Sequence, residues 1–479
     1  MEHKGIGFPR ILGMCIGKKN YDNIDYLNNI ARVHIAILGF YPGWTSASGK
    51  TPQQIVDELK SRNPTLRVGQ YTILSETPDS QDRTSADSDK GRKLDTENWW
   101  LRNALGGRVQ WTTEYGAFEA NISRWVDADA QGLRYSEWLA RRDAKQYFNT
   151  IKGLSIWFFD NALDRPAVSL ADWNKDGKDD SKFDELIAAE YRAGHAREWA
   201  EAKSLCPLVD HMGNATDISS IEYSGKLQGA FLEALMGLSW SLETQSGWTA
   251  VMARYRSAMR HTTAPHLVGF SVHGEKTDYR LMRYGLASCL LDDGYFSYTD
   301  VREGYGVIPW FDEYDAALGS PLDAPPTTPW SNGVYRRLYK NGMVLVNPEN
   351  TTATVRIEPG YQRIKGAQDP AVNTGARSTS ITLVSKDGIL LVKSPNSVKR
   401  VFIESLSIAP SPNPQMIRIY FKGLIIIDQE HVNFGGTPER NYSIEVLADT
   451  RHSVIRRLAI ERLALAFSVR PSDVQFLNF

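Results

Sequence analysis

Eight short apolar runs, rich in β-branched and aromatic residues, recur through the first 300 residues and constrain the fold most strongly. Several stretches between them have helical periodicity: TPQQIVDELKSRN opens with Thr51, and SKFDELIAAEYRAGHAREWAEAKS has apolar residues at helical spacing after Ser181. Strands alternating with helical or loop segments in this way predict an α/β fold, a (β/α)8 TIM barrel. The runs are RILGMCIG (10–17), VHIAILGF (33–40), RVGQYTIL (67–74), LSIWFFDN (154–161), PLVDHMGN (207–214), GAFLEAL (229–235), HLVGFSVHG (266–274) and DGYFSYTD (293–300).

The third connection, residues 75–153, is much longer than the others. It begins with the polar stretch ETPDSQDRTSADSDKGRK, continues with an aromatic segment from residue 99, and ends with the expected helix SEWLARRDAKQYF. Long loops on a barrel usually have a function of their own or are disordered. We expect the polar part to be mobile and the aromatic part to form a wall of the cleft.

The pattern changes after the proline-rich segment PLDAPPTTPW, which marks the end of a barrel domain at 1–325. Short alternating runs then predict an all-β sandwich-like domain at 333–405, with hairpins at Asn341-Gly342 and Asp387-Gly388. A second break, APSPNPQ, precedes a small α/β appendage at 414–479 of unknown role. There MIRIYFKGLIIIDQEHV is expected to form strands and SVIRRLAIERLALAFSV a helix.

Charge and cysteine content exclude several classes of partner. The formal net charge is −1, with 55 basic and 56 acidic residues and no long block of either sign, so neither nucleic acid nor an anionic membrane is expected to bind. Cys15, Cys206 and Cys289 are far apart without CxxC spacing and are expected in the core. The sequence as given has no signal peptide and no apolar segment of 18 residues, and it identifies no compartment; extracellular or virion-associated action is compatible with it.

Two carboxylates fall where a barrel places its catalytic groups, at the carboxyl ends of the strands. Asp160 ends the fourth strand and Glu233 lies in the sixth, so they are expected to face each other across the barrel mouth. Glycoside hydrolysis needs such a pair, one acid as nucleophile and the other as proton donor. The alternatives are a helix cap or loop acid at Asp160, and a helical rather than extended GAFLEALMGLSW around Glu233.

Other polar or aromatic side chains lie near the expected strand ends or in the long connection. With 13 Trp and 21 Tyr, the chain has many rings that can stack on a pyranose face. Glu114 and Glu119 are reserve candidates for the acid role. The expected sugar-binding residues are Trp44, Tyr71, Glu114, His211, Asn214, His273, Tyr298 and Asp300.

DWNKDGKDD, residues 172–180, is similar to the start of a calcium loop. Position twelve would be Phe183 instead of the required bidentate acid, so the alternative is a polar βα loop that turns. We expect a structural Ca²⁺ here and no organic cofactor. The expected ligands are Asp172, Asn174, Asp176 and Asp180.

Several segments together resemble the hypothetical glycosyl hydrolase family 15, over residues 10–395. They are FFDNALDRP, DWNKDGKDD, HMGNA, GAFLEALMG, DGYFSYTD, WFDEYDAALGSP and VYRRLYKNGMVLVNP. The resemblance implies a TIM barrel with a C-terminal β domain, akin to the α-galactosidase-like clan. It also implies that Asp160 is the nucleophile and Glu233 the acid/base, although better-known clan members usually have Asp in the second role.

We therefore expect a glycoside hydrolase that cleaves an oligo- or polysaccharide by a two-carboxylate, retaining mechanism. The rival hypothesis is a non-catalytic carbohydrate-binding or structural protein of a viral or cell-surface assembly that kept the barrel. A polysaccharide lyase is a weaker alternative, because its acidic substrate does not match the balanced charge. The sequence gives no signal for an oligomeric state.

Overall fold

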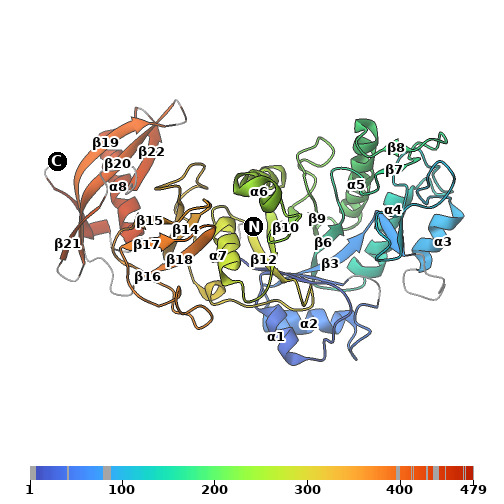
Figure 1. The fold of residues 1–479 in the computed structure, drawn as a ribbon, viewed down its shortest axis with the longest axis horizontal. Coiled ribbons are helices and arrows are strands. Elements are labelled where there is room, and N and C mark those ends of the chain that lie inside the picture. Colours follow the sequence, from blue (N-terminus) through green and yellow to red (C-terminus); the bar gives the residue numbers. More distant parts are fainter. Residues whose placement is uncertain are drawn as a thin grey trace. The chain divides into compact units, whose positions relative to one another are not determined.

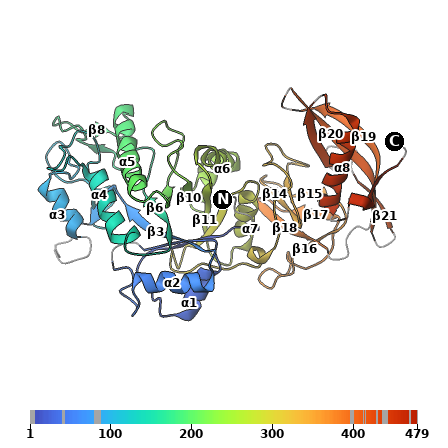
Figure 2. The same cartoon turned by 180° about the vertical axis from the view of Figure 1, so that it is seen from behind.

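The computed structural model describes residues 7–39, 43–78, 88–394, 400–411, 413, 415–427, 430–434, 442–447, 449–467, 469 and 471–477. The chain divides into two compact units (Figures 1 and 2). The barrel unit comprises Ile11–Lys276 and Gly294–Pro309. The C-terminal unit comprises Met1–Arg10, Thr277–Asp293 and Trp310–Phe479.

The barrel unit is built on an eight-stranded sheet in which every pair of neighbours is parallel. A parallel bridge between Ile11 and Phe296 brings the first strand beside the last, which closes the sheet. All eight predicted strands are present, so the predicted (β/α)8 class is confirmed. In sheet order they are β1 (Leu12–Cys15), β2 (Ile35–Leu38), β3 (Arg67–Ile73), β6 (Leu154–Asp160), β9 (Asp210–Asn214), β10 (Gly229–Met236), β11 (Leu267–Gly274) and β12 (Tyr295–Asp300).

Side chains from alternate strand positions fill the barrel interior. One buried cluster contains Ile156 and Phe158 of β6, Met212 of β9 and Phe231 of β10, among others. Because successive residues of a strand point to opposite faces, the residues two positions after Phe158, Met212 and Phe231 point the same way, at the carboxyl end of the core. Those residues are Asp160, Asn214 and Glu233.

The helices of the barrel unit follow local signals. Helix α2 (Pro52–Arg62) begins as predicted after Thr51, which forms a capping box with Gln54. Helix α5 (Glu185–Leu205) begins three residues later than the sequence suggested, because Asp184 instead of Ser181 caps its first turn. The other helices of the barrel unit lying directly after barrel strands are α1 (Ile24–Ala31) after β1 and α6 (Leu242–His261) after β10.

The expected alternation is incomplete between β9 and β10, where residues 215–228 form turns without a helix. Polar and glycine residues dominate this segment, and it lacks the apolar periodicity that a surface helix needs.

The long third connection forms a layer of its own (Figure 1). Strand β4 (Glu76–Pro78) pairs with β5 (Ala117–Glu119), α3 (Ser88–Thr96) lies between these strands in the chain, and α4 (Tyr135–Asp143) follows β5 and continues as a π-helix to Phe148. Residues 76–78 and 88–93 of the polar stretch form β4 and part of α3, whereas residues 79–87 lie outside the described part of the chain; mobility of the stretch stays a prediction.

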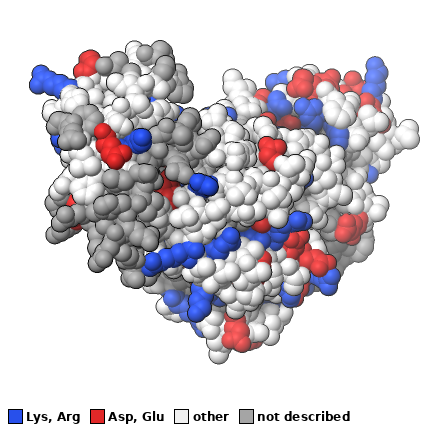
Figure 3. All heavy atoms as spheres, turned by 60° about the vertical axis from the view of Figure 1, so that its left-hand side comes forward, with Lys and Arg blue, Asp and Glu red and all other residues white. Residues whose placement is uncertain are grey.

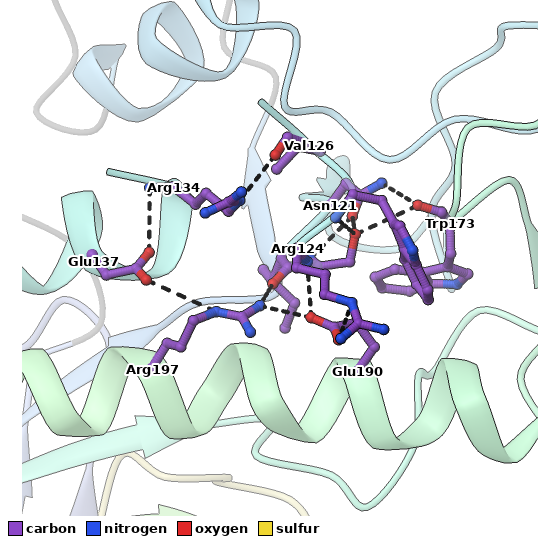
Figure 4. Close-up of polar contacts among 11 residues, drawn as sticks. Asn121, Arg124, Val126, Arg134, Glu137, Trp173, Glu190 and Arg197 are labelled. Carbon is purple, nitrogen blue, oxygen red and sulfur yellow. Dashed lines mark hydrogen bonds and ion pairs between the residues drawn. The ribbon is translucent and has the colours of Figure 1, made fainter. Parts of the chain in front are cut away.

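Polar contacts attach this layer to α5 (Figure 4). Glu190 accepts a hydrogen bond from the backbone N–H of Arg124 at 2.8 Å and forms an ion pair with Arg197 at 3.1 Å. The Arg197 guanidinium also donates to the carbonyl of Ile122 at 2.7 Å. The layer is therefore held on the barrel by directional bonds as well as by its aromatic core, which includes Trp99, Trp100, Tyr135 and Trp173.

The C-terminal unit contains the predicted antiparallel strands from residue 335 onward. The β13–β14 hairpin is confirmed, but its turn is Lys340-Asn341, one residue before the expected Asn341-Gly342, because Gly342 already pairs with Tyr339. The hairpin expected at Asp387-Gly388 is wrong, because β17 pairs with β15 in a different sheet from β18. Gly388 instead allows close packing of α7 (Tyr279–Cys289): a Cβ at this position would lie 2.5 Å from that of Ala287. The strands are β13 (Tyr335–Tyr339), β14 (Gly342–Asn347), β15 (Ala353–Arg356), β16 (Tyr361–Arg363), β17 (Ser380–Leu383) and β18 (Asp387–Lys393).

The last part of the chain forms a mixed sheet, in which β23 pairs in parallel with β19 and the other pairs are antiparallel, and α8 (His452–Phe467) packs on it, in agreement with the expected strands and helix. APSPNPQ is a connection inside this sheet, since the strand before it pairs with the strand after it. The expected domain limits stay a prediction, and the limit at residue 405 falls within a strand. The strands are β19 (Arg400–Pro410), β20 (Met416–Ile427), β21 (Glu430–Phe434), β22 (Tyr442–Leu447) and β23 (Val474–Phe476).

Both signs of charge occur among larger uncharged areas on the face shown in Figure 3. Among the described residues, no helix is both long enough and apolar enough to span a membrane. Cys15, Cys206 and Cys289 are buried and form no disulfide, as expected of core residues.

Candidate active site

Asn214 connects the two acids that the sequence singled out. Its side-chain Nδ2 donates to Asp160 Oδ1 at 2.8 Å and to Glu233 Oε2 at 2.9 Å. β9, which ends at Asn214, lies between β6 and β10 in the sheet, so the strand order itself places the amide between the carboxylates. Both bonds start at the same nitrogen and are 2.8 and 2.9 Å long. Asp160 Oδ1 and Glu233 Oε2 are therefore at most about 5.7 Å apart.

Two tyrosines complete the hydrogen bonding of the pair. The hydroxyl of Tyr71, on β3, donates to Asp160 Oδ2, and the hydroxyl of Tyr305, which follows β12, donates to Glu233 Oε1. Each carboxylate therefore accepts one bond from a tyrosine and one from Asn214. Bonds of this kind stabilise the ionised form of a carboxyl group.

Burial is the main electrostatic influence on Asp160. It raises the pKa of this carboxyl group from 3.8 to about 6, and the nearby charge of Glu233 adds to the shift. The hydrogen bonds from Tyr71 and Asn214 act in the opposite direction. A carboxyl group with such a pKa is mostly ionised at neutral pH and gains a proton in mildly acidic solution.

The backbone is irregular on the Glu233 side. The register between β10 and β11 shifts between Leu232 and Met236, and Ala234 has a φ of 44°. Bulges of this kind re-aim side chains next to active sites, and a positive φ at a residue with a Cβ is strained. GAFLEALM is a strand and not the helix that its sequence also allowed.

A third carboxylate, Glu76, approaches the site from the inserted layer. Its Oε2 accepts a hydrogen bond from the indole of Trp111 at 2.7 Å, and burial together with the charge of Asp160 raises its pKa. Tyr115 packs against Trp111 with ring centroids 6.1 Å apart. Trp111 and Tyr115 keep 45% and 54% of their surface exposed, which is compatible with the expected cleft wall.

The reserve acids are placed differently. Glu119 is buried opposite Glu76 in the β4–β5 pair, and burial raises its pKa well above the ordinary value. Glu114 is exposed, and its charge contributes to the raised pKa of the neighbouring Tyr115 after the larger effect of burial. Neither makes a described hydrogen bond to Asp160 or Glu233.

Tyr71, Asn214 and His273 are the expected sugar-binding residues that lie at or beside the acid pair. His273 packs edge-on against Tyr305 at 5.9 Å, and burial lowers the pKa of its imidazole to about 4. It is therefore neutral at pH 7 and supports the tyrosine that bonds Glu233.

The structure does not bring the remaining expected residues to the acids. Strand alternation turns His211, Tyr298 and Asp300 away from the interior side that Met212 and Tyr295 occupy. His211 packs on Phe159, the Tyr298 hydroxyl donates to the carbonyl of Glu275, and Asp300 accepts from the backbone of Arg302. Trp44 is buried against Tyr21. A role in sugar binding stays a prediction for these four.

The family model of the hypothetical glycosyl hydrolase family 15 matches residues 60–343, more than half of the chain. The chain belongs to this family. It is therefore a glycoside hydrolase, as predicted, and the acid pair lies within the matched residues. No curated protein matches the sequence.

Three solved structures are similar to this family member. The glycoside hydrolase domain of PelA from Pseudomonas aeruginosa is 12% identical over 63% of this chain and 98% of its own, with a TM-score of 0.39. The cycloalternan-degrading enzyme from Trueperella pyogenes in complex with isomaltose is 11% identical over 80% and 62%, with a TM-score of 0.43. The GH36 alpha-galactosidase AgaA from Geobacillus stearothermophilus is 8% identical over 81% and 57%, with a TM-score of 0.39. Similarities this low do not identify a substrate.

The loop at residues 172–180 uses its carboxylates to hold a turn. Asp172 accepts hydrogen bonds from the backbone N–H groups of Asp176 and Gly177, and Asp180 accepts from those of Trp173 and Asn174. Within the described part of the chain, no group of three or more His, Cys, Asp or Glu side chains is arranged to hold a metal ion. Calcium binding at this loop stays a prediction.

Tyr305 and Glu76 were missed in the sequence. Glu76 follows the third predicted strand by two residues, which is the signal that placed other candidates, but the polar composition around it suggested a loose loop. Tyr305 lies five residues beyond β12, and no periodic pattern marks it.

Proposed function

We propose that this glycoside hydrolase cleaves its substrate with retention of anomeric configuration, with Asp160 as nucleophile and Glu233 as acid/base. The observation that carries the proposal is the single Asn214 amide bonded to both carboxylates, which limits the gap between two of their oxygens to about 5.7 Å. Retaining enzymes have carboxyl groups about 5 to 5.5 Å apart, whereas inverting enzymes need roughly 6.5 to 9.5 Å to admit water.

The chemistry proceeds in two displacements. In the first, the ionised Asp160 oxygen attacks the anomeric carbon while Glu233 gives its proton to the departing glycosidic oxygen, which forms a glycosyl ester on Asp160. In the second, Glu233 takes a proton from a water molecule, the hydroxide oxygen attacks the same carbon, and the Asp160 carboxylate leaves. Both acids end in their starting protonation states.

The assignment of roles follows the resemblance to the α-galactosidase-like clan, whose nucleophile closes the fourth barrel strand. Asp160 is the last residue of the fourth strand in sheet order, β6. With a pKa of about 6 it is mostly in the ionised, nucleophilic form at pH 7. Tyr71 and Asn214 hold its two oxygens in place by hydrogen bonds.

The experiment compares Asp160→Asn and Glu233→Gln with wild type on a panel of oligo- and polysaccharides. Proton NMR of the first product identifies its anomeric form, and release of reducing ends measures the rate. Asp57→Asn and Glu185→Gln are matched controls, because they remove carboxylates from exposed positions. Both site variants should lose sugar release while keeping the wild-type circular dichroism spectrum.

Three results would contradict the proposal. An inverted first product would exclude the double displacement. Full activity of either site variant would exclude that residue from the chemistry. Binding of a glycan by wild type without release from any member of the panel would favour the rival hypothesis, a carbohydrate-binding protein on a barrel scaffold.

A further inference from the structure

A cavity of about 350 Å³ opens beside Glu233 in the barrel unit. Glu233 and Asn214 line it together with Trp240, Gln245 and Arg254, whereas Asp160 does not. Its volume is at the lower end of the range for small-molecule pockets, roughly 300 to 1,000 Å³. The cavity therefore adjoins the proposed acid/base and not the proposed nucleophile.

We propose that this cavity binds the leaving-group sugar, and that this sugar carries an anionic group that Arg254 recognises. The inference rests on the proposed function, because the two acids define the two sides of the scissile bond. The nucleophile attacks one side of the anomeric carbon, and the departing oxygen must receive its proton from the other acid. The leaving sugar consequently lies on the Glu233 side.

Trp240 provides a surface for the sugar ring. It lies in the loop between β10 and α6 and keeps 60% of its surface exposed at the cavity. Within the described residues its indole stacks on no other ring and forms no hydrogen bond. An exposed indole face is a good platform for the C–H groups of a pyranose.

Arg254 provides the charge. It is half-buried on α6 and lines the cavity, yet it makes no ion pair or hydrogen bond with any residue that the structure describes. Comparable arginines of the barrel unit are paired, as Arg67 is with Asp210 and Arg192 with Glu222. A guanidinium that faces a cavity without a partner suits a carboxylate or sulfate, which it binds with two parallel hydrogen bonds.

The carboxylate of Glu233, which lines the same cavity, forms no described ion pair with this guanidinium. The two oxygens of Glu233 accept from Tyr305 and Asn214. Gln245 donates to the carbonyl of Ser239 at 2.6 Å, which leaves its own side-chain carbonyl available to a sugar hydroxyl. A pyranose with a carboxylate or sulfate group would therefore find an aromatic face, a hydrogen-bond acceptor and a matching cation in one cavity.

Binding of monosaccharides to the full-length protein tests the inference independently of catalysis. Saturation-transfer NMR titrations with methyl glucuronoside, methyl galacturonoside and glucose 6-sulfate would be compared with titrations of methyl glucoside, methyl galactoside and glucose. The carboxylated and sulfated sugars distinguish the two sources of the anion. At least one anionic sugar should bind about tenfold or more tightly than its neutral counterpart.

Variants locate that preference. Arg254→Gln should abolish the preference for anionic sugars, and Trp240→Ala should weaken the binding of anionic and neutral sugars alike. Arg260→Gln, at an exposed position of the same helix, should change neither the preference nor the affinities. Equal binding of every anionic and neutral pair by wild type, or a preference that survives Arg254→Gln, would overturn the inference.

Repeating the titrations with Asp160→Asn separates the two proposals. The anion preference should persist in this variant, because Asp160 does not line the cavity. If the preference is present but wild type cleaves no glycan, the cavity is a binding site and the proposed mechanism fails. If glycans are cleaved with retention but the preference is absent, only the inference about the cavity fails.

Discussion

The two acids of the candidate site are held by contrasting pieces of backbone. The register of β6 with β3 shifts near its start but is continuous from Ile156 to Asp160, so strand alternation directs Asp160, two residues after the interior side chain of Phe158, into the barrel mouth. Glu233 lies where the register of its strand shifts, beside the positive φ of Ala234. Asp160 thus follows a stretch of continuous pairing, whereas Glu233 lies inside a local distortion that the surrounding fold must sustain.

The largest expected effect tests whether the two acids have different chemical roles. Asp160→Asn should lower kcat by on the order of 10⁴-fold or more for every substrate, because no other group replaces the nucleophile. Glu233→Gln should cost about 10² to 10⁴-fold for ordinary glycosides and much less for aryl glycosides whose phenolate leaves without a proton.

Steady-state rates with both kinds of substrate measure this difference, and added azide sharpens it. Azide should restore turnover of Glu233→Gln by attacking the glycosyl ester and giving a product of retained configuration. If the rates of both variants depend equally on the leaving group, the roles assigned to Asp160 and Glu233 are wrong.

A second prediction concerns pH. Because Asp160 must be ionised to attack, kcat/KM should fall as the pH decreases through about 6. The hydrogen bond from Tyr71 lowers the pKa of Asp160, so Tyr71→Phe should move this acidic limb to higher pH.

Tyr305→Phe is the matched control, since it removes a hydroxyl that bonds Glu233 instead. The acidic limb of this variant should keep its wild-type position while the rate decreases. A limb that does not move in Tyr71→Phe, or activity that rises below pH 6, would show that Asp160 is not the ionised nucleophile.

A third prediction concerns stability on the Asp160 side. The folded pKa of about 6 exceeds the ordinary 3.8, so the folded state holds the proton more tightly and loses stability as the pH rises through this window. Asp160→Asn removes this cost and should stabilise the protein at pH 7 by up to about 3 kcal/mol, an upper limit because part of the residue stays exposed.

Thermal or urea unfolding at pH 7 and pH 4 checks this sign. The gain should shrink towards pH 4, where the wild-type carboxyl group is protonated in the folded state. If the variant is less stable than wild type at pH 7, the hydrogen bonds of the Asp160 carboxylate stabilise the fold by more than its burial costs.

The smallest expected effect tests the distortion on the Glu233 side. Ala234→Gly should stabilise the fold by about 0.5 to 1 kcal/mol, because glycine accepts the positive φ without strain. Asn161, which follows Asp160, has a φ of 50°, but Asn tolerates this conformation, so Asn161→Gly should change stability less. Urea unfolding of the two variants compares them, and a destabilised Ala234→Gly would contradict strain in the bulge.

Local signals in the sequence were sufficient for much of the barrel. The apolar runs located all eight strands, and the Thr51 capping signal located the start of α2. The start of α5 was misplaced by three residues because Ser181 and Asp184 are both suitable caps, and only the pairing of β7 (Leu170–Ala171) with β8 (Asp180–Ser181) excludes the first. Asp387-Gly388 has the composition of a hairpin turn, yet its flanking strands joined different sheets.

The sequence by itself determined the barrel class, the family resemblance and the position of Asp160, because periodicity and strand ends are properties of neighbouring residues. Only the tertiary structure decided that Asn214 bridges Asp160 to Glu233 and that Tyr305 completes the pair. These contacts join residues that are 19 to 72 positions apart and lie on different strands or loops. The order of β6, β9 and β10 in the sheet and the return of the chain after β12 bring them together, and no local pattern in the sequence records which strands become neighbours.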